Sequence, residues 1–369
     1  MTDRFEIFLV GTPGLEDMLL AEVREHAFTD PRQVPGGVLI TGGWTDVWRA
    51  NLVLRGATRV LARIGSFMAF HLAQLDKRAR KFPWGDVLRA DVPVRVEVAT
   101  SRKSKIYHAG AATQRVENAL KEVHGMTIAA DAPVTVKLRI DDNRVTISVD
   151  TSGESLHKRG HKEAVGKAPM RETLAALMLH RCGYDGAEPV LDPMCGSGTF
   201  VIEAAEIASG LHPGRSREFA FQHLASFDPI GWEELRAPPS TGAPPARFYG
   251  SDRDAGAIRM ATANAERAGV SQLTDFATHP FSDVTRPDGP PGLIICNPPY
   301  GGRIGQQKML YGLYGALGET LRAQFSGWRV GIVTSEAKLA HATGLPFKPQ
   351  GPAIPHGGLK VWLFQTGPL

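Results

Sequence analysis

The 369-residue sequence is poor in cysteine and in long apolar runs, and both absences exclude classes of protein. Its three cysteines, Cys182, Cys195 and Cys296, are widely scattered without metal-ligand spacing, so we expect a reducing compartment, the cytoplasm, and no metal. No apolar stretch is long enough to span a bilayer, and the first residues lack a signal-peptide pattern, so we expect no membrane partner. With 43% hydrophobic residues, the chain should bury a core in two or three domains.

The phosphate-binding fingerprints of nucleotide enzymes are missing from the main glycine-rich turn. Gly196 and Gly198 belong neither to a Gly-x-Gly-x-x-Gly pattern nor to a turn followed by Gly-Lys-Ser/Thr. A short strand is expected to end at Leu191 and a helix to run through residues 200–205, and the glycines between them let a ligand approach the backbone closely. The acid before the turn, Asp192, suits a cationic, amino-acid-like ligand such as S-adenosylmethionine (SAM) better than a pyrophosphate. A strand–turn–helix unit without a ligand is the alternative.

A second acidic signal follows a later predicted strand that ends near Gly250. Asp252 stands where an acidic side chain can bind the hydroxyl groups of a ribose. Asp254 is better explained as the cap of the helix that runs through Ile258, Ala261 and onward.

The motif Asn297, Pro298, Pro299, Tyr300 comes after the apolar run 292–296, which predicts a buried parallel strand. The prolines cannot continue a strand, so the motif should lie at the carboxyl edge of the sheet, where open α/β sheets bind ligands. The Asn297 side-chain oxygen and the Pro298 carbonyl can each accept a hydrogen bond from one amino group. Tyr300 can present a flat face to a nucleobase. An ordinary Asn-Pro turn is the alternative.

Together these three elements resemble the class I SAM-dependent methyltransferases that modify exocyclic amines of nucleobases. Residues 99–108, 150–160 and 168–176 resemble THUMP-containing bacterial enzymes that make N2-methylguanosine in large-subunit (23S) ribosomal RNA. The resemblance covers nearly the whole chain. It implies an α/β fold, in which a Rossmann-like methyltransferase domain follows an α+β ferredoxin-like/THUMP RNA-binding module.

The resemblance also implies domain boundaries. We expect a ferredoxin-like domain at residues 1–54, a THUMP domain at 55–152, a linker at 153–168 and a SAM-dependent methyltransferase domain at 169–369. The alternating segments 94–98, 134–138 and 145–149 predict strands of the first module, with a hairpin turn at 141–143. The last strands, at 330–334 and 359–364, should supply an antiparallel edge to the catalytic sheet.

The cofactor that the resemblance implies is SAM, with its methionine end near Asp192 and the 196–198 turn and its ribose near Asp252. The cofactor-binding residues that we expect are Pro169, Met170, Asp192, Pro193, Cys195, Gly196, Ser197, Gly198, Thr199, Asp252, Arg253, Phe281 and Asn297. The catalytic residues that we expect are Asn297, Pro298, Pro299 and Tyr300. A small buried residue remains the simpler interpretation of Cys195.

Basic residues are concentrated in the amino-terminal half. Residues 55–121 contain 14 Lys and Arg against 5 Asp and Glu, although the net charge of the chain is only +4. Basic clusters near aromatic residues suit a nucleic-acid backbone, although a solvated basic face is the simpler interpretation of any single lysine. The RNA-binding residues that we expect are Arg78, Arg80, Lys81, Arg102, Lys103, Lys105, Tyr107, Lys158 and Arg159.

The chain departs from the family pattern at two positions. Pro280 stands where an acid that binds the adenine amine is expected, and Asp283 is a candidate replacement. Gly302 stands where the family often has an acidic residue. Three functions therefore stay open: a ribosomal RNA guanine-N2 methyltransferase, a transfer RNA guanine-N2 or nucleic-acid adenine-N6 methyltransferase, and a non-catalytic RNA-binding assembly factor.

Overall fold

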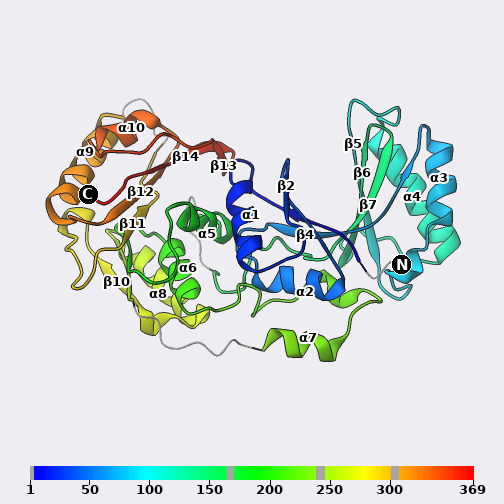
Figure 1. Ribbon diagram of the computed structural model, residues 1–369, viewed down its shortest axis with the longest axis horizontal. Coiled ribbons are helices and arrows are strands. Elements are labelled where there is room, and N and C mark those ends of the chain that lie inside the picture. Colours follow the sequence, from blue (N-terminus) through cyan, green and yellow to red (C-terminus); the bar gives the residue numbers. More distant parts are fainter. Residues whose placement is uncertain (1–3, 164–169, 238–245, 301–306) are drawn as a thin grey trace. The chain divides into compact units, whose positions relative to one another are not determined.

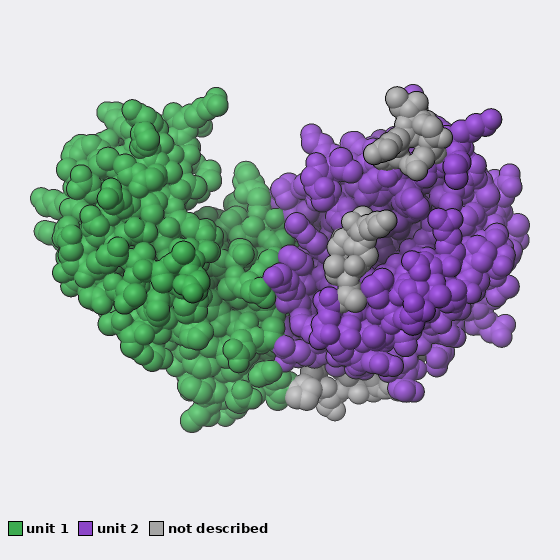
Figure 2. Space-filling view, turned by 180° about the vertical axis from the view of Figure 1, so that it is seen from behind, with its two compact units in different colours: residues 1–11, 20–156, 217–237 green, residues 12–19, 157–216, 238–369 purple. Residues whose placement is uncertain are grey.

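A computed structural model describes residues 4–163, 170–237, 246–300 and 307–369. The chain forms two compact units, which are coloured separately in Figure 2. Unit 1 comprises residues 1–11, 20–156 and 217–237, and unit 2 comprises residues 12–19, 157–216 and 238–369. In the residues that the structure describes, each unit is built around one seven-stranded mixed sheet.

The first sheet combines strands from the whole amino-terminal half of the chain, and all but one of its helices are formed by the residues between these strands. Its strands are β1 (Phe5–Val10), β2 (Arg32–Val34), β3 (Gly37–Gly42), β4 (Arg59–Met68), β5 (Val94–Thr100), β6 (Val134–Asp141) and β7 (Arg144–Asp150). The helices of this part are α1 (Glu16–Glu25), α2 (Trp44–Val53), α3 (Leu72–Lys81), α4 (Ala109–His124) and α7 (Pro229–Arg236).

The strand order β2-β3-β1-β4-β7-β6-β5 makes the ferredoxin-like strands and the later strands one continuous sheet. β4 is the link, because it pairs antiparallel with β1 on one side and with β7 on the other. The strands predicted at 94–98, 134–138 and 145–149 are confirmed as β5, β6 and β7. The turn between β6 and β7 is confirmed too, since Asp142 and Asn143 have positive φ angles of 47° and 60°, as a tight hairpin requires.

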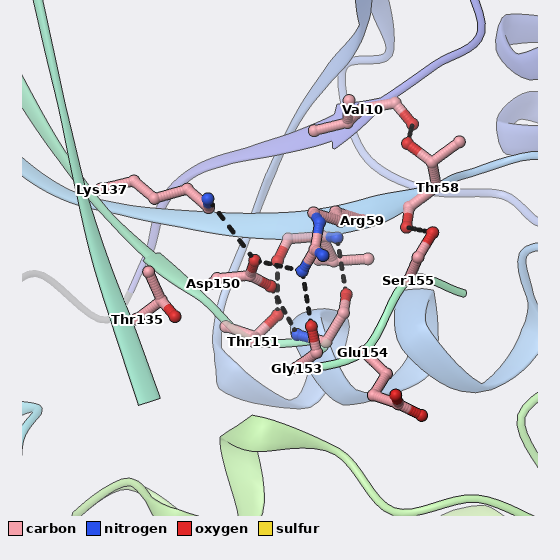
Figure 3. Close-up of polar contacts among 12 residues, drawn as sticks. Val10, Thr58, Arg59, Thr135, Lys137, Asp150, Thr151, Gly153, Glu154 and Ser155 are labelled. Carbon is pink, nitrogen blue, oxygen red and sulfur yellow. Dashed lines mark hydrogen bonds and ion pairs between the residues drawn. The ribbon is translucent and has the colours of Figure 1, made fainter. Parts of the chain in front are cut away.

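A polar cluster fixes the chain where it leaves β7 (Figure 3). Asp150 is buried, and its carboxylate accepts a 2.5 Å hydrogen bond from Nη1 of Arg59 and lies 4.0 Å from Nζ of Lys137. The same Arg59 nitrogen donates to the carbonyl of Gly153 at 2.5 Å. Thr151 donates its hydroxyl to the carbonyl of Val60 at 2.7 Å. Residues 150–153 are therefore held against β4 by ionic and hydrogen-bonded contacts.

Unit 2 contains the predicted catalytic motifs. Its strands are β8 (Val190–Asp192), β9 (Phe248–Asp252), β10 (Thr274–Thr278), β11 (Leu293–Cys296), β12 (Arg329–Thr334), β13 (Ile354–His356) and β14 (Leu359–Gln365). Its helices are α5 (Glu172–Arg181), α6 (Thr199–Ala208), α8 (Ala255–Ala268), α9 (Gln307–Gln324) and α10 (Ala337–Ala342).

The second sheet has the order β10-β9-β8-β11-β12-β14-β13. The first five strands are parallel, and the order reverses between β8 and β11, whose carboxyl ends therefore border a crevice suited to ligands. In Figure 1, α5, α6 and α8 gather on one side of this sheet, and α9 and α10 gather on the other. The predicted antiparallel strand at 359–364 is confirmed as β14, which pairs with β12. The edge strand itself is β13, which the sequence did not indicate.

The core beneath β11 and β12 is apolar and holds large aromatic side chains from α9 and the loop after it. Tyr314, Phe325 and Trp328 are each fully buried there with Ile294 and Ile332. At about 25 cal/mol per Å² of apolar surface removed from water, such residues supply much of the stability of this face. No helix in the described residues is both long enough and apolar enough to cross a membrane.

Candidate functional site

A cavity of about 640 Å³ opens at the carboxyl ends of β8, β9 and β11, at the point where the strand order reverses. Four segments line it, at residues 192–197, 252–253, 280–281 and 297–300, together with Met170, Thr199, Phe200 and Leu313. Its size suits a ligand of drug or cofactor dimensions. Motifs that are more than a hundred residues apart in the sequence therefore meet in one place, all within unit 2.

The turn after β8 is held by its own backbone. The Gly198 amide donates to the Cys195 carbonyl at 2.8 Å, and the Cys195 amide donates to the Ser251 carbonyl at 2.9 Å. Gly196 and Gly198 have φ angles of 51° and 82°, which favour glycine. A Cβ at Gly198 would meet the Cβ of Ala261 at 3.0 Å, whereas one at Gly196 would point into open space. Gly198 thus serves packing, and only Gly196 offers bare backbone to a ligand.

Asp192 places a carboxyl group at the floor of the cavity. It is 2% exposed, and its Oδ1 accepts a 3.0 Å hydrogen bond from the Met194 amide. Burial raises the pKa of this carboxyl to about 8, and the negative charge of Asp252 contributes in the same direction. A cationic ligand would reverse that effect by stabilising the ionised carboxylate.

Asp252 ends β9 and joins two motifs. Its Oδ2 accepts the Gly196 amide at 3.1 Å, and its Oδ1 accepts the Asp254 amide at 3.0 Å. The prediction that Asp254 caps the following helix is confirmed, because its side chain accepts the Gly256 amide at 2.7 Å at the start of α8.

Asn297 presents an unusual acceptor. Its side-chain Oδ1 is buried and has no hydrogen-bond partner among the described residues. Burial raises the pKa of the neighbouring Tyr300 phenol, while a hydrogen bond with the Asn297 side chain opposes that change. Tyr314 donates from below to the Pro299 carbonyl at 3.4 Å, which anchors the motif on α9. An orphaned acceptor is costly in a buried site, so its persistence points to a donor that arrives with a ligand.

The structure brings most of the predicted residues together. The predicted cofactor-binding residues that line the cavity are Met170, Asp192, Pro193, Cys195, Gly196, Ser197, Thr199, Asp252, Arg253, Phe281 and Asn297, and all four predicted catalytic residues line it as well. Gly198 lies behind the lining, and Pro169 and Gly302 lie outside the described residues. Asp283 is exposed and lies outside the lining, and its carboxylate accepts from the Ser282 hydroxyl.

Three other residues of the site carried no sequence signal. Met194, Phe200 and Leu313 line the cavity as ordinary apolar neighbours of the motifs, and Pro280, noted above as a departure from the family pattern, lines it as well. Burial raises the pKa of the Cys195 thiol well above its usual value, so this thiol stays protonated and suits the role of a small buried residue. Among the residues the structure covers, no cluster of His, Cys, Asp and Glu is placed to hold a metal ion.

Most of the predicted RNA-binding residues are exposed. Arg78, Lys81, Arg102, Lys103, Lys105 and Lys158 are exposed, and Tyr107 is 75% exposed. Arg80 is less available, because it pairs with Asp76 at 2.9 Å and with Glu122 at 2.7 Å. The prediction for Arg159 is wrong. Its guanidinium is buried and pairs with Glu203 at 2.6 Å and with Glu206 at 3.5 Å, which leaves it out of reach of a phosphate.

One exposed surface extends the predicted basic patch. The amide of Lys105 donates to Oδ1 of Asn143 at 2.8 Å, and the amide of Ala69 donates to the Asn143 carbonyl at 2.9 Å. These contacts bring Phe70, which is 42% exposed, beside the basic loop, with Nζ of Lys105 5.5 Å from its ring centroid. We call Phe70, Arg102, Lys103, Lys105 and Tyr107 the basic-aromatic surface. Phe70 was missed because a single aromatic residue between two predicted elements carries no sequence signal.

Comparison with known proteins identifies matches to both units. Residues 159–346 match the family model of the RMKL-like methyltransferase domain, and residues 6–61 match that of the RlmL ferredoxin-like domain. A ribosomal RNA large subunit methyltransferase K/L from Vibrio campbellii is 32% identical over 89% of this chain and 49% of its own length. The chain thus spans about half the length of the curated relatives it matches.

Two solved structures match nearly from end to end. A candidate methyltransferase crystallised with S-adenosylhomocysteine (SAH) has a TM-score of 0.87 and 26% identity, covering 100% of this chain and 99% of its own. A protein from Listeria monocytogenes, described as a predicted N6-adenine-specific DNA methylase, has a TM-score of 0.86 and 29% identity, covering 99% of this chain and 97% of its own. These matches extend over both units.

Proposed function

Because this chain belongs to the family of RMKL-like methyltransferases, we propose that it transfers a methyl group from SAM to the exocyclic N2 amine of a guanosine in large-subunit (23S) ribosomal RNA. The name of the curated relatives supports this choice of substrate. The match covers about half of the length of those relatives. Ribosomal RNA as substrate also supports action in the cytoplasm.

The cavity has the chemistry that SAM requires. Gly196 offers open backbone, as a cofactor cradle needs, and Asp192 offers a buried carboxyl group to the cationic methionine end. Asp252 and Arg253 offer polar groups to the ribose, and Phe281 offers an apolar face to the adenine. When bound, SAM supplies an electrophilic methyl group on its sulfonium. The solved relative that contains SAH supports the same choice of cofactor.

The observation that carries the proposal is the unpartnered Oδ1 of Asn297. An aromatic amine is a poor nucleophile because its lone pair is delocalised into the ring. A fixed acceptor attracts an amine hydrogen, favours a pyramidal nitrogen and localises the lone pair. Oδ1 of Asn297 is such an acceptor in a buried site, where a hydrogen bond is stronger than in water. The Pro298 carbonyl is proposed as the acceptor for the second amine hydrogen.

Tyr300 is proposed to stack on the target base and so to fix the line of attack. A base must leave its helix to reach a pocket of this kind, and an aromatic face compensates for part of the lost stacking. Positioning and fixed dipoles then provide most of the rate, so the mechanism requires no strong general base. The cavity agrees with this, since no histidine or glutamate belongs to its described lining.

RNA is proposed to bind unit 1 through the basic-aromatic surface. Its lysine and arginine side chains suit phosphates, and the exposed rings of Phe70 and Tyr107 suit unpaired bases. The strands that carry it continue the ferredoxin-like sheet through β4. The proposed ferredoxin-like and THUMP parts therefore share one sheet, and most of the proposed methyltransferase domain belongs to unit 2, with residues 217–237 in unit 1.

Adenine-N6 methylation is the second candidate. The solved relative from Listeria monocytogenes favours it by its description, and an Asn-Pro-Pro-Tyr motif can serve either amine. The two candidates differ in the product, which a nucleoside analysis identifies directly.

The test is transfer of tritium from labelled SAM into RNA from cells that lack this protein, followed by separation of RNA classes and nucleoside analysis. We expect N2-methylguanosine in the large ribosomal RNA. The same nucleoside in transfer RNA would change the substrate, and N6-methyladenosine would overturn the choice of base. No transfer to any RNA, despite measurable SAM binding, would contradict the proposed reaction.

A further inference from the structure

Lys162 is a partly buried cation that contacts two residues of the cavity wall. Its Nζ donates to the Met170 carbonyl at 2.7 Å and to Oγ1 of Thr199 at 2.9 Å. Its side chain is only 13% exposed. Met170 and Thr199 line the cavity, whereas Lys162 itself lies behind them. The ammonium group therefore ties the chain ahead of α5 to the first turn of α6.

The charges around Lys162 are balanced by specific pairs. Glu172 lies 3.5 Å from its Nζ, while Glu203 and Glu206 pair with Arg159, and Glu206 pairs with Arg215 as well. Burial lowers the pKa of Lys162, and the charge of Glu172 opposes that change. Removing most of a lysine side chain from water costs free energy, even beside a paired glutamate. This cost points to a use for the charge of Lys162.

The bond to Thr199 fixes the direction of a hydroxyl group. Because the Thr199 oxygen accepts a charge-assisted hydrogen bond from Lys162, its own proton remains available to donate. Among the hydrogen bonds of the described residues, that hydroxyl donates to no protein group. A hydroxyl donor on a cavity wall, backed by an ammonium group, fits an anionic acceptor. In an amino-acid ligand that acceptor is the α-carboxylate.

We propose that Thr199 donates its hydroxyl to the α-carboxylate of the methionine end of SAM, and that Lys162 is the positioning residue that orients this hydroxyl. The assignment rests on the proposed function, because it presumes that SAM occupies this cavity. It adds a residue outside the cavity lining to the determinants of cofactor affinity. Thr199 stands next to the 196–198 turn, the end of the cavity already proposed for the methionine moiety.

The test compares two ligands that differ only at the end in question. SAH carries the amino-acid end, whereas methylthioadenosine has the same adenosine and a neutral thioether without it. Calorimetry with the full chain measures both affinities in the wild type and in Lys162→Met, Lys162→Arg and Thr199→Val. Lys338→Met, which removes an exposed lysine of α10, is the matched control.

We expect Lys162→Met and Thr199→Val to weaken SAH binding roughly 10-fold to 100-fold, the range for one lost charge-assisted hydrogen bond, and to leave methylthioadenosine binding unchanged. Lys162→Arg should restore most of the SAH affinity, because it retains the charge and several donors. Lys338→Met should bind both ligands as the wild type does. Should Lys162→Met fail to fold beside an unpaired Glu172, the double variant Lys162→Met, Glu172→Gln removes both charges and tests the same prediction.

If Lys162→Met weakens the binding of SAH and of methylthioadenosine equally, Lys162 only supports the cavity wall. This result would overturn the assignment. Wild-type affinity for SAH in Lys162→Met and Thr199→Val would overturn it as well, while leaving the proposed function intact. Wild-type protein that binds neither ligand would instead overturn the proposed function and the assignment with it.

Discussion

The backbone amide of Gly196 donates a 3.1 Å hydrogen bond to the carboxylate of Asp252, 56 residues later in the chain. This bond joins the glycine turn after β8 to the end of β9, so the proposed methionine and ribose subsites share one wall. It also means that a change at either residue disturbs both subsites.

Substitutions at Asp252 and at Asp254 should have different effects, the first on cofactor binding and the second on helix capping. We expect Asp252→Ala to lower SAM affinity strongly, because it removes the acceptor of the Gly196 amide as well as the proposed ribose contact. Asp254→Ala should keep the affinity and cost about 0.5–2 kcal/mol of stability, as the loss of a helix cap does. Calorimetry and thermal unfolding of both variants measure the two effects. Wild-type affinity in Asp252→Ala would exclude the ribose role.

SAM affinity should depend on pH through Asp192. Its pKa of about 8 in the free protein means that the carboxyl is protonated at neutral pH, whereas a bound cation favours the ionised form. Binding therefore releases a proton, and affinity should rise with pH until about 8 and then level off. Asp192→Asn should remove this dependence and bind weakly at every pH, while Asp283→Asn, which changes an exposed acid, should follow the wild type. A SAM affinity of the wild type that does not change with pH would contradict the proposed role of Asp192.

The carboxyl group of Asp192 should also make the stability of the ligand-free protein depend on pH. The folded-state pKa lies above the unfolded value of about 4, so the folded state binds the extra proton between these values. Stability therefore falls as pH rises from about 4 to about 8. Asp192→Asn should lose that decline, which urea unfolding of the ligand-free protein measures at several pH values.

Asn297→Ala should separate catalysis from folding and from cofactor binding. Loss of one positioned group at a reacting centre costs on the order of 10²–10³-fold in rate. Stability should fall only slightly, because Oδ1 has no hydrogen-bond partner among the described residues and the variant loses only the side-chain contact with Tyr300. His279→Ala serves as a control and should retain transfer, since the mechanism requires no base. Retained turnover in Asn297→Ala, measured with tritiated SAM, would exclude the proposed acceptor.

The basic-aromatic surface should bind RNA by two separable effects. Phe70→Ala and Tyr107→Ala should each cost about 1–3 kcal/mol in binding of unpaired RNA, with the salt dependence unchanged. Lys105→Ala should reduce the slope of log affinity against log salt by about one. Val123→Ala, an exposed apolar residue of α4, is the control. Unchanged affinity and slope in all three variants would place RNA binding elsewhere.

Arg159→Ala should lower stability, because it leaves Glu203 and Glu206 buried without this partner. Breaking a buried ion pair from one side costs about 3–5 kcal/mol, whereas Lys158→Ala at the exposed neighbour should change stability by less than about 0.5 kcal/mol. Chemical unfolding compares the two. Equal stability in both variants would mean that the buried pairs are weak.

Local patterns predicted those parts of the fold that depend on neighbours in sequence. Alternation over 134–138 indicated β6, and the acid at 254 indicated a helix cap. The pairing of strands depends on distant contacts instead. β4, which joins both halves of the first sheet, was not predicted although its burial alternates along the strand, and β13, which has only three residues, carried too little local signal.

In the site, too, residues with a local sequence signal were predicted, and residues placed by distant contacts were not. Asp192, Asp252 and Asn297 were predictable, because acids and amides after buried strands converge at one edge of a parallel sheet. Arg159 was misplaced because its segment is polar and basic, and its two acidic partners lie 44 and 47 residues further along, on α6. Lys162 gave no signal at all, since only the folded chain brings it to Met170 and Thr199.

The proposed reaction transfers the methyl group to the exocyclic N2 amine of guanosine. The most direct measurement is transfer of tritium from labelled SAM to two transcripts of the same large-subunit RNA segment, one with guanosine and one with inosine in its place. Inosine lacks only that amine. We predict label in the guanosine transcript and none in the inosine transcript. Equal label in both would show that the methyl group goes to a position other than the N2 amine.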